Sequence, residues 1–117
     1  MIEFESEALS LKILVTAFDA FDGESTNPAL EAVHRLDTHI GEHVITKLEI
    51  PTVFHESKNV ICKALKEDTY DVVLAIGQAG GRFEITPERV GINIDDARIP
   101  DNKGNQPIDK VIKEDGA

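Results

Sequence analysis

VVLAIGQAGGRFEITPERVGINIDDARIPDN, residues 72–102, is the stretch that decides the fold. It opens with the apolar run Val72–Ile76, and short continuous apolar runs are typical of strands buried on both faces of a sheet. The segment Gly77–Arg82 follows and contains three glycines, which permit backbone turns that a Cβ would forbid. Ligands of open α/β sheets bind where such strands end. The stretch therefore predicts a strand, over 71–76, that is buried on both faces and followed by a binding loop.

The second half of this stretch carries charged groups close to the glycine turn. Val90–Ile94 has strand propensity, so the segment 83–94 predicts one or two further strands. Glu88 precedes this run, and Arg98 follows it in a polar segment that is too broken for a core element. A strand, a glycine turn, a carboxylate and an arginine within 31 residues indicate a functional site.

Upstream of the central run, strand and helix patterns alternate. Asn27-Pro28 is a typical helix start, because Asn caps the first turn and Pro suits its first position. Alternating strands and helices favour parallel pairing through crossover helices. We therefore expect a single α/β domain over 1–117, with an open, mostly parallel sheet of three or four strands and flanking helices. The strands expected here are 11–16 and 43–50, and the helices are 28–37 and 55–67.

Composition excludes several classes of partner. The formal net charge is −10, from 22 acidic and 12 basic residues, so we expect neither nucleic acid nor an anionic membrane as a partner. The single cysteine, Cys62, cannot form an internal disulfide, and the N-terminus is acidic where a signal peptide is basic. No apolar stretch approaches the ~20 residues of a membrane helix. These features predict a cytoplasmic protein.

Neither the histidines nor the aspartates predict a metal site. His39 and His43 are four residues apart, but Gly41 interrupts any helix that would align them. The acidic cluster around Arg98 lacks the spacing of a calcium loop, so we interpret it as loop structure. We expect no metal and no cofactor.

Five blocks of this sequence, in order and in register, resemble the pyroglutamyl peptidases of the pyrrolidone-carboxylate peptidase type. The blocks are FDAF at 18–21, NP at 27–28, GQAGGR at 77–82, ITPERV at 85–90 and INIDDARIPDN at 92–102. The resemblance runs from about Lys12 to the last residue and leaves 1–10 as an unmatched extension. The family continues for nearly as long again, so the chain resembles its N-terminal half, and the expected fold is incomplete relative to the family.

The resemblance implies a cysteine peptidase that removes an N-terminal pyroglutamyl residue from peptides. It assigns Glu88 as the carboxylate that orients the catalytic histidine, in place of a surface pair with Arg82 or Arg89. It also assigns the aromatics of FDAF to the walls of the pyroglutamyl ring pocket, although loop aromatics otherwise fold back onto the core. It assigns Thr52 to the substrate pocket, although the residue would otherwise be interpreted as a turn threonine. The substrate-binding residues it implies are Phe18, Phe21, Thr52, Gln78, Arg98 and Ile99.

Two members of the family's catalytic set have no counterpart in this sequence. No cysteine follows Glu88 and no histidine follows His55. Cys62 lies within an expected helix, away from its positive N-terminal end, which is typical of an inert packing residue. We therefore expect the chain alone to be inactive, marginally stable and prone to associate; the family tends to form homotetramers. An alternative is a non-catalytic module that binds pyroglutamyl peptide ends or a C-terminal half. A phosphate-binding turn is the weakest alternative, since GQAGGR is not a Walker loop.

Overall fold

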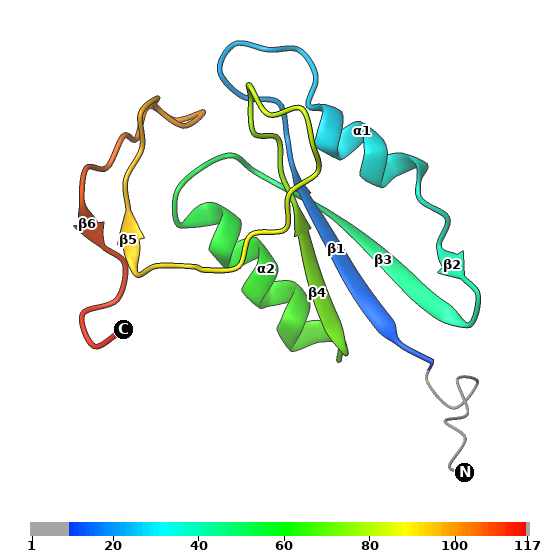
Figure 1. The fold of residues 1–117 in the computed structure, drawn as a ribbon. Coiled ribbons are helices and arrows are strands. Elements are labelled where there is room, and N and C mark those ends of the chain that lie inside the picture. The colour runs from blue at the N-terminus through cyan, green and yellow to red at the C-terminus, as the bar shows by residue number, and fades with distance from the viewer. Residues whose placement is uncertain (1–9, 117) are drawn as a thin grey trace.

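The computed structural model describes residues 10–116, so all of the unmatched extension except Ser10 lies outside the described residues (Figure 1). The elements follow one another as strands and helices along the chain. They are β1 (Lys12–Phe18), α1 (Pro28–Arg35), β2 (His39–Ile40), β3 (His43–Ile50), α2 (Glu56–Glu67), β4 (Val72–Ile76), β5 (Ile94–Asp95) and β6 (Lys110–Val111).

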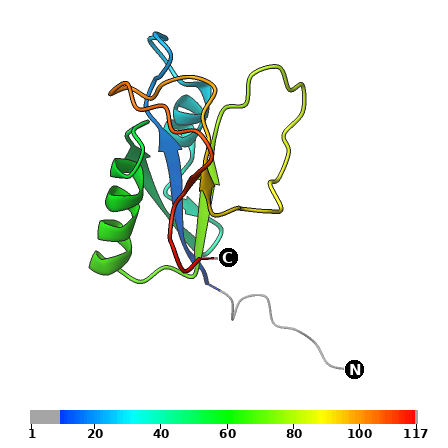
Figure 2. The same cartoon turned by 90° about the vertical axis from the view of Figure 1, so that its left-hand side faces the viewer.

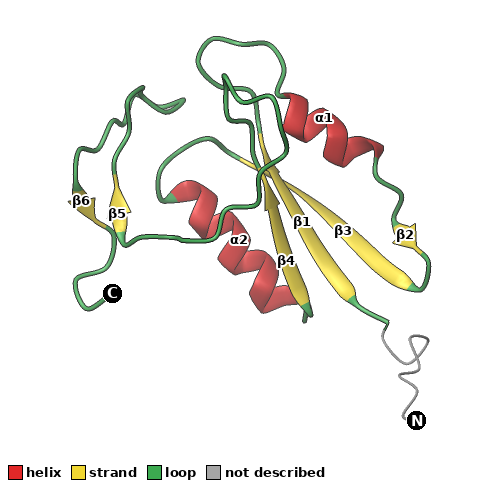
Figure 3. Ribbon diagram, viewed as in Figure 1, coloured by secondary structure: helices red, strands yellow, loops and turns green. Residues whose placement is uncertain are grey.

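The main sheet has the strand order β2-β3-β1-β4 (Figure 3). β1 lies in the centre and runs parallel to β3 and to β4, while the two-residue β2 is antiparallel to β3. The expected α/β fold with a mostly parallel sheet is therefore confirmed. Because these three strands are parallel, their carboxyl ends emerge at one edge of the sheet, and the loops that follow them meet there (Figure 1).

The two crossover connections leave β1 and β3 in opposite directions across the sheet, which places α1 and α2 on opposite faces. Figure 2 shows α2 standing to one side of the sheet. The buried core lies under α1, where Val15, Leu30, Val33 and Ile45 pack together around Ala17. The helix α2 has no fully buried residue. Leu14, Thr16 and Ile50 are also buried but lie outside this cluster, so burial is not confined to the residues packed under α1.

Asn27 caps α1 as the sequence predicts. Its side chain accepts a hydrogen bond from the Ala29 amide at 2.9 Å, and Pro28 occupies the first helical position. The helix ends at Arg35, two residues before the expected end. The helix α2 begins at Glu56, one residue later than expected, and β1 extends to Phe18 instead of ending at Thr16. These differences are of the size that helix and strand ends usually show.

The expectation that 71–76 is buried on both faces is wrong. The strand β4 forms, but Val72, Val73 and Leu74 are 41–50% exposed. The cause is its position: β4 is an edge strand that pairs with β1, and nothing among the described residues pairs with its other edge. An apolar run predicts a strand, but only its neighbours decide how much of it is buried.

The expected strands over 83–94 are also mostly absent. Only Ile94–Asp95 forms a strand, β5, and it pairs with β6 in a separate two-stranded sheet. The preceding residues, 77–93, form a long arm that loops away from the sheet (Figure 2). Phe83 and Ile85 on this arm are fully exposed. A strand needs partners for its backbone N–H and C=O groups, and among the described residues the arm obtains one between segments only at its last residue, where the Ile112 amide donates to the Asn93 carbonyl at 3.3 Å.

Candidate substrate-binding cleft

A cleft of about 530 Å³ lies beside the carboxyl ends of β1 and β3. Three segments form its walls: the loop after β1, the loop between β3 and α2, and the segment 96–102, which we call the arginine loop. Its lining is mainly apolar, with one cationic and one anionic side chain. The lining residues are Phe21, Thr52, Phe54, Ala97, Arg98, Ile99, Pro100 and Asp101.

Asp19 joins the loop after β1 to the loop after β3. Its Oδ1 accepts hydrogen bonds from the backbone amide of Thr52 at 2.8 Å and from the Thr52 hydroxyl at 2.7 Å. Its own amide donates to the Ile50 carbonyl at 2.9 Å, which continues the ladder between the two strands. The side chain of one residue thereby fixes both the backbone and the hydroxyl of Thr52.

The N-terminal cap of α1 also holds the loop after β1 in place. Asn27 is 2% exposed, and its Nδ2 donates to the Asp19 carbonyl at 3.2 Å while its Oδ1 caps the helix. A buried amide with both ends bonded holds its neighbours rigidly, because releasing either bond would leave a polar group unpaired. The loop after β1 is therefore anchored to α1 as well as to β3.

Asn102 attaches the arginine loop to the loop after β1 and to the loop after β3. Its Nδ2 donates to Asp19 Oδ1 at 3.2 Å and to the Ala20 carbonyl at 2.8 Å. Its backbone amide donates to the Thr52 carbonyl at 3.0 Å. Residues separated by more than 80 positions in sequence thus meet beside Thr52, which lines the cleft.

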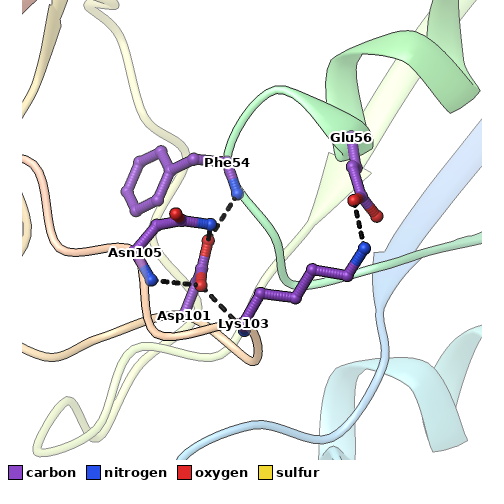
Figure 4. Close-up of polar contacts among 5 residues, drawn as sticks. All are labelled: Phe54, Glu56, Asp101, Lys103 and Asn105. Atoms are coloured by element: carbon purple, nitrogen blue, oxygen red, sulfur yellow. Dashed lines mark hydrogen bonds and ion pairs between the residues drawn. The ribbon is translucent and has the colours of Figure 1, made fainter.

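Asp101 attaches the arginine loop to the start of α2 (Figure 4). Its carboxylate accepts hydrogen bonds from the amides of Phe54 (2.8 Å), Lys103 (2.9 Å) and Asn105 (2.8 Å) and from Asn105 Nδ2 (2.9 Å). Removal from solvent raises the pKa of the Asp101 carboxyl, but the bond from the Asn105 side chain and those from the three amides outweigh it and lower the pKa to about 2. Lys103 adds an ion pair with Glu56.

Four of the predicted site residues line the cleft, and three do not. Phe21, Thr52, Arg98 and Ile99 lie in its walls, and Thr52 is at once a loop residue and a pocket residue. The others are absent from the lining: Phe18, Gln78 and Glu88.

Phe18 is the half-buried last residue of β1, whereas Gln78 and Glu88 are exposed on the arm. Glu88 is 72% exposed, and its Oε1 lies 2.7 Å from Arg82 Nη1, so the surface pair that the sequence left open does form. Gly81 in the glycine turn has a φ of +82°, which favours glycine and agrees with the expected tight turn.

Sequence reasoning missed Asp19, Phe54, Asp101 and Asn102 as organisers of the cleft. Asp19 and Asn102 stand within the sequence blocks that carry the resemblance, but their bonds join distant positions. The available signal was weak: a carboxylate or amide immediately after a strand or within a turn commonly bonds backbone groups nearby. Nothing in the sequence indicated which distant amides would be bonded.

A metal site and a membrane-spanning helix are both absent from the part of the chain that the structure describes. Within residues 10–116, no group of three or more histidine, cysteine or acidic side chains is arranged to hold a metal ion. The described helices are α1 and α2, and neither is long and apolar enough to cross a membrane.

Comparison with known proteins places this geometry in a family. The family model described as pyroglutamyl peptidase matches residues 11–117. The pyrrolidone-carboxylate peptidase of Staphylococcus haemolyticus is 76% identical over 107 residues, and that of Staphylococcus saprophyticus is 68% identical over 106. These alignments cover 92% and 91% of this chain but 50% of each relative, so the chain spans about half the length of the curated relatives it matches.

Solved structures agree in fold. The crystal structure of pyroglutamyl peptidase I from Bacillus amyloliquefaciens superposes with a TM-score of 0.87 and 48% identity, covering 92% of this chain and 53% of that one. A mutant pyrrolidone carboxyl peptidase from Pyrococcus furiosus superposes with a TM-score of 0.86 at 38% identity, with 92% and 52% coverage. The sequence blocks, the fold and the extent of the match lead to one assignment: the chain belongs to the pyroglutamyl peptidase family.

Proposed function

We propose that this chain supplies the ring-binding part of a pyroglutamyl peptidase, an enzyme that hydrolyses the bond after an N-terminal pyroglutamyl residue. The observation that carries the proposal is the cleft, because four residues that the family resemblance assigns to substrate binding line one cavity. The substrates are peptides with an N-terminal pyroglutamate.

The walls of the cleft suit the chemistry of the pyroglutamyl ring. That ring is a flat, uncharged lactam, so it needs apolar walls and a few directed hydrogen bonds. Phe21, Phe54 and Ile99 offer apolar surface, and Thr52 offers a polar atom beside them. Arg98 lies in the same wall and can bond a carbonyl oxygen of the substrate.

Cleavage requires groups beyond those in the cleft. In this mechanism a cysteine thiolate attacks the carbonyl, a histidine transfers the proton, and a carboxylate orients the histidine. Glu88 fits the role of the carboxylate and lies exposed on the arm, where an approaching histidine can reach it. The 117 residues contain no cysteine after Glu88 and no histidine after His55. We infer that these 117 residues alone do not cleave peptides.

The unpaired edge of β4 is where we expect a C-terminal half carrying the catalytic cysteine and histidine to pair with the sheet. A parallel strand with one unpaired edge offers a row of backbone donors and acceptors to a further strand. Exposed Val72, Val73 and Leu74 add apolar surface along the same strand. A C-terminal half that adds strands here would bring its own loops to the edge of the sheet where the cleft lies.

Reassembly with a relative's C-terminal half tests the proposal. The 117-residue chain is mixed with the C-terminal half of the Staphylococcus haemolyticus protein, and the release of a fluorogenic amine from its pyroglutamyl amide is measured. We expect turnover by the mixture and none by either part alone. Turnover by the purified chain alone would overturn our account of the missing groups, and an inactive but associated mixture would overturn the peptidase assignment.

A non-catalytic binding module is the second candidate, because Phe21, Thr52 and Arg98 line a cleft in a chain that has no cysteine after Glu88 and no histidine after His55. It predicts that pyroglutamamide (the carboxamide of pyroglutamate) shifts the amide resonances of Thr52 and Ile99 in the isolated chain. It also predicts that adding the C-terminal half yields no turnover. Binding together with turnover in the mixture would favour the peptidase instead.

A further inference from the structure

The hydroxyl of Thr52 has its hydrogen committed before any ligand arrives. Oγ1 lies 2.7 Å from Asp19 Oδ1 and 3.2 Å from the Asp19 carbonyl oxygen. A hydroxyl has one hydrogen to donate, and both oxygens in reach are acceptors that belong to the same residue. Whichever of the two receives it, the hydrogen points to Asp19.

A hydroxyl in this state can only accept a further hydrogen bond. Its remaining lone pairs are free, and Thr52 lines the cleft. We infer that Asp19 is a positioning residue that fixes Thr52 Oγ1 as an acceptor and so selects ligands that present a ring N–H. This inference rests on the proposed function, because it assigns the selected N–H to the lactam of the pyroglutamyl ring.

The surroundings of Asp19 make this orientation rigid. Its Oδ1 also accepts from the Thr52 amide at 2.8 Å and from Asn102 Nδ2 at 3.2 Å, so three donors converge on one oxygen. Its backbone carbonyl is held by the buried Asn27 amide. Rotating the Thr52 hydroxyl away would leave one acceptor short of a donor in a half-buried place, which costs free energy.

Two ligands that differ in one ring atom can test the orientation of the Thr52 hydroxyl directly. Pyroglutamamide has a ring N–H, whereas 5-oxotetrahydrofuran-2-carboxamide has a ring oxygen in its place and is otherwise similar in shape. Opposite Thr52, the first donates a hydrogen bond and the second sets two acceptors against each other. We expect the wild-type chain to prefer the lactam by roughly 10–100-fold, the effect of one unpaired polar contact.

The test compares Asp19→Ala with Asp19→Asn. Asp19→Ala removes the nearer acceptor and leaves only the Asp19 carbonyl, at 3.2 Å, within reach of the hydroxyl. The hydroxyl can then turn and donate to the lactone ring oxygen, so the lactam preference falls to within a few-fold. In Asp19→Asn the three converging donors favour the amide oxygen at the same place, so most of the preference is retained. Binding of both amides to the full chain is followed by NMR titration. The kcat/KM ratio of the corresponding fluorogenic amides is measured in the reassembled pair.

Two further variants keep the test decisive if Asp19→Ala does not fold. Thr52→Val removes the acceptor itself and lowers the preference to the same level. A double variant with Asp19→Asn lowers it no further, because the two residues act through one hydroxyl. Glu24→Ala, an exposed substitution in the same loop, serves as the control and leaves the preference unchanged.

The outcomes separate this inference from the proposed function. An unchanged lactam preference in a folded Asp19→Ala, or in Thr52→Val, overturns the role of Asp19 and leaves the peptidase proposal standing. Failure of pyroglutamamide to bind either the chain or the reassembled pair overturns the proposed function, and the selection of a ring N–H with it.

Discussion

The arginine loop and the arm are neighbours in sequence but differ in how the chain holds them. Asp101 and Asn102 bond the arginine loop to Phe54, Thr52 and the loop after β1. On the arm, residues 77–93, an exposed ion pair joins Glu88 to Arg82, and Phe83 is fully exposed. Under the proposed function, the difference separates the part of the site that this chain forms from the part that we expect a C-terminal half to complete.

The largest effect is expected on the arm, and only after reassembly. In the mixture with a C-terminal half, Glu88→Gln keeps the shape of the side chain but loses the charge that orients and stabilises a catalytic histidine. By analogy with other triads we expect kcat to fall by about 10⁴-fold. Glu84→Gln, an exposed neighbour on the arm, is the matched control and should change kcat little.

The isolated chain responds differently to the same change. Because Glu88 is exposed and its one pair is a surface pair, Glu88→Gln leaves the fold and the binding of pyroglutamamide nearly unchanged. Loss of ligand binding in this variant would contradict the division between arm and cleft.

A second prediction concerns the edge strand. We expect the isolated chain to self-associate, because β4 has an unpaired edge and carries exposed apolar side chains. Leu74→Lys places a charge on that strand and should shift the chain toward monomer in sedimentation velocity. Thr69→Lys, an exposed change of the same charge outside the strand, is the control. A monodisperse wild-type monomer with a sharp unfolding transition would contradict this prediction.

Local patterns predicted the elements, whereas the contacts between elements were out of reach. Helical spacing and an Asn-Pro start predicted α1. A β-branched run predicted β1, an alternating pattern predicted β3, and an apolar run predicted β4. The exposure of β4 depends on what lies beside it, and the bond from Asn102 to Asp19 joins positions 83 apart. The strand propensity of Val90–Ile94 was realised only at Ile94, because propensity describes a fit to a sheet, and the main sheet does not extend to residues 90–93.

The same limit applied to the site. Resemblance supplied Phe21, Thr52, Arg98 and Ile99, which the structure places in one cleft. It could not indicate Asp19 or Asp101, because their role is to bond backbone amides that come together only in the folded chain. Glu88 and Gln78 were assigned by motif, and their roles stay predictions.

A third prediction follows from the low pKa of Asp101. Its carboxyl has a pKa of about 2 in the folded chain against a usual 3.8, so the folded state favours the charged form. The stability that this carboxylate contributes is fully present above pH 4 and is lost as the pH falls toward 2. Amide exchange at Phe54, Lys103 and Asn105 should therefore accelerate, relative to the core of β1, over this acid range.

Asp101→Asn tests the origin of that acid response. The amide keeps an acceptor oxygen but has no charge to lose, so the acceleration between pH 4 and pH 2 disappears while exchange at neutral pH is faster throughout. An unaltered acid response in this variant would assign the effect to another carboxylate.

The smallest effect is expected for the arm's own ion pair. Arg82 Nη1 lies 2.7 Å from Glu88 Oε1, but the two side chains are 50% and 72% exposed, so solvent screens their attraction. Exposed pairs of this kind contribute about 0–1 kcal/mol, and Arg82→Ala should change the free energy of unfolding by no more than that in urea titration. Lys63→Ala breaks the exposed pair with Glu67 on α2. The change in unfolding free energy that it causes is the reference value for losing a surface pair in this chain. If Arg82→Ala destabilised the chain well beyond Lys63→Ala, the arm would be held by the chain itself, and the contrast between arm and arginine loop would fail.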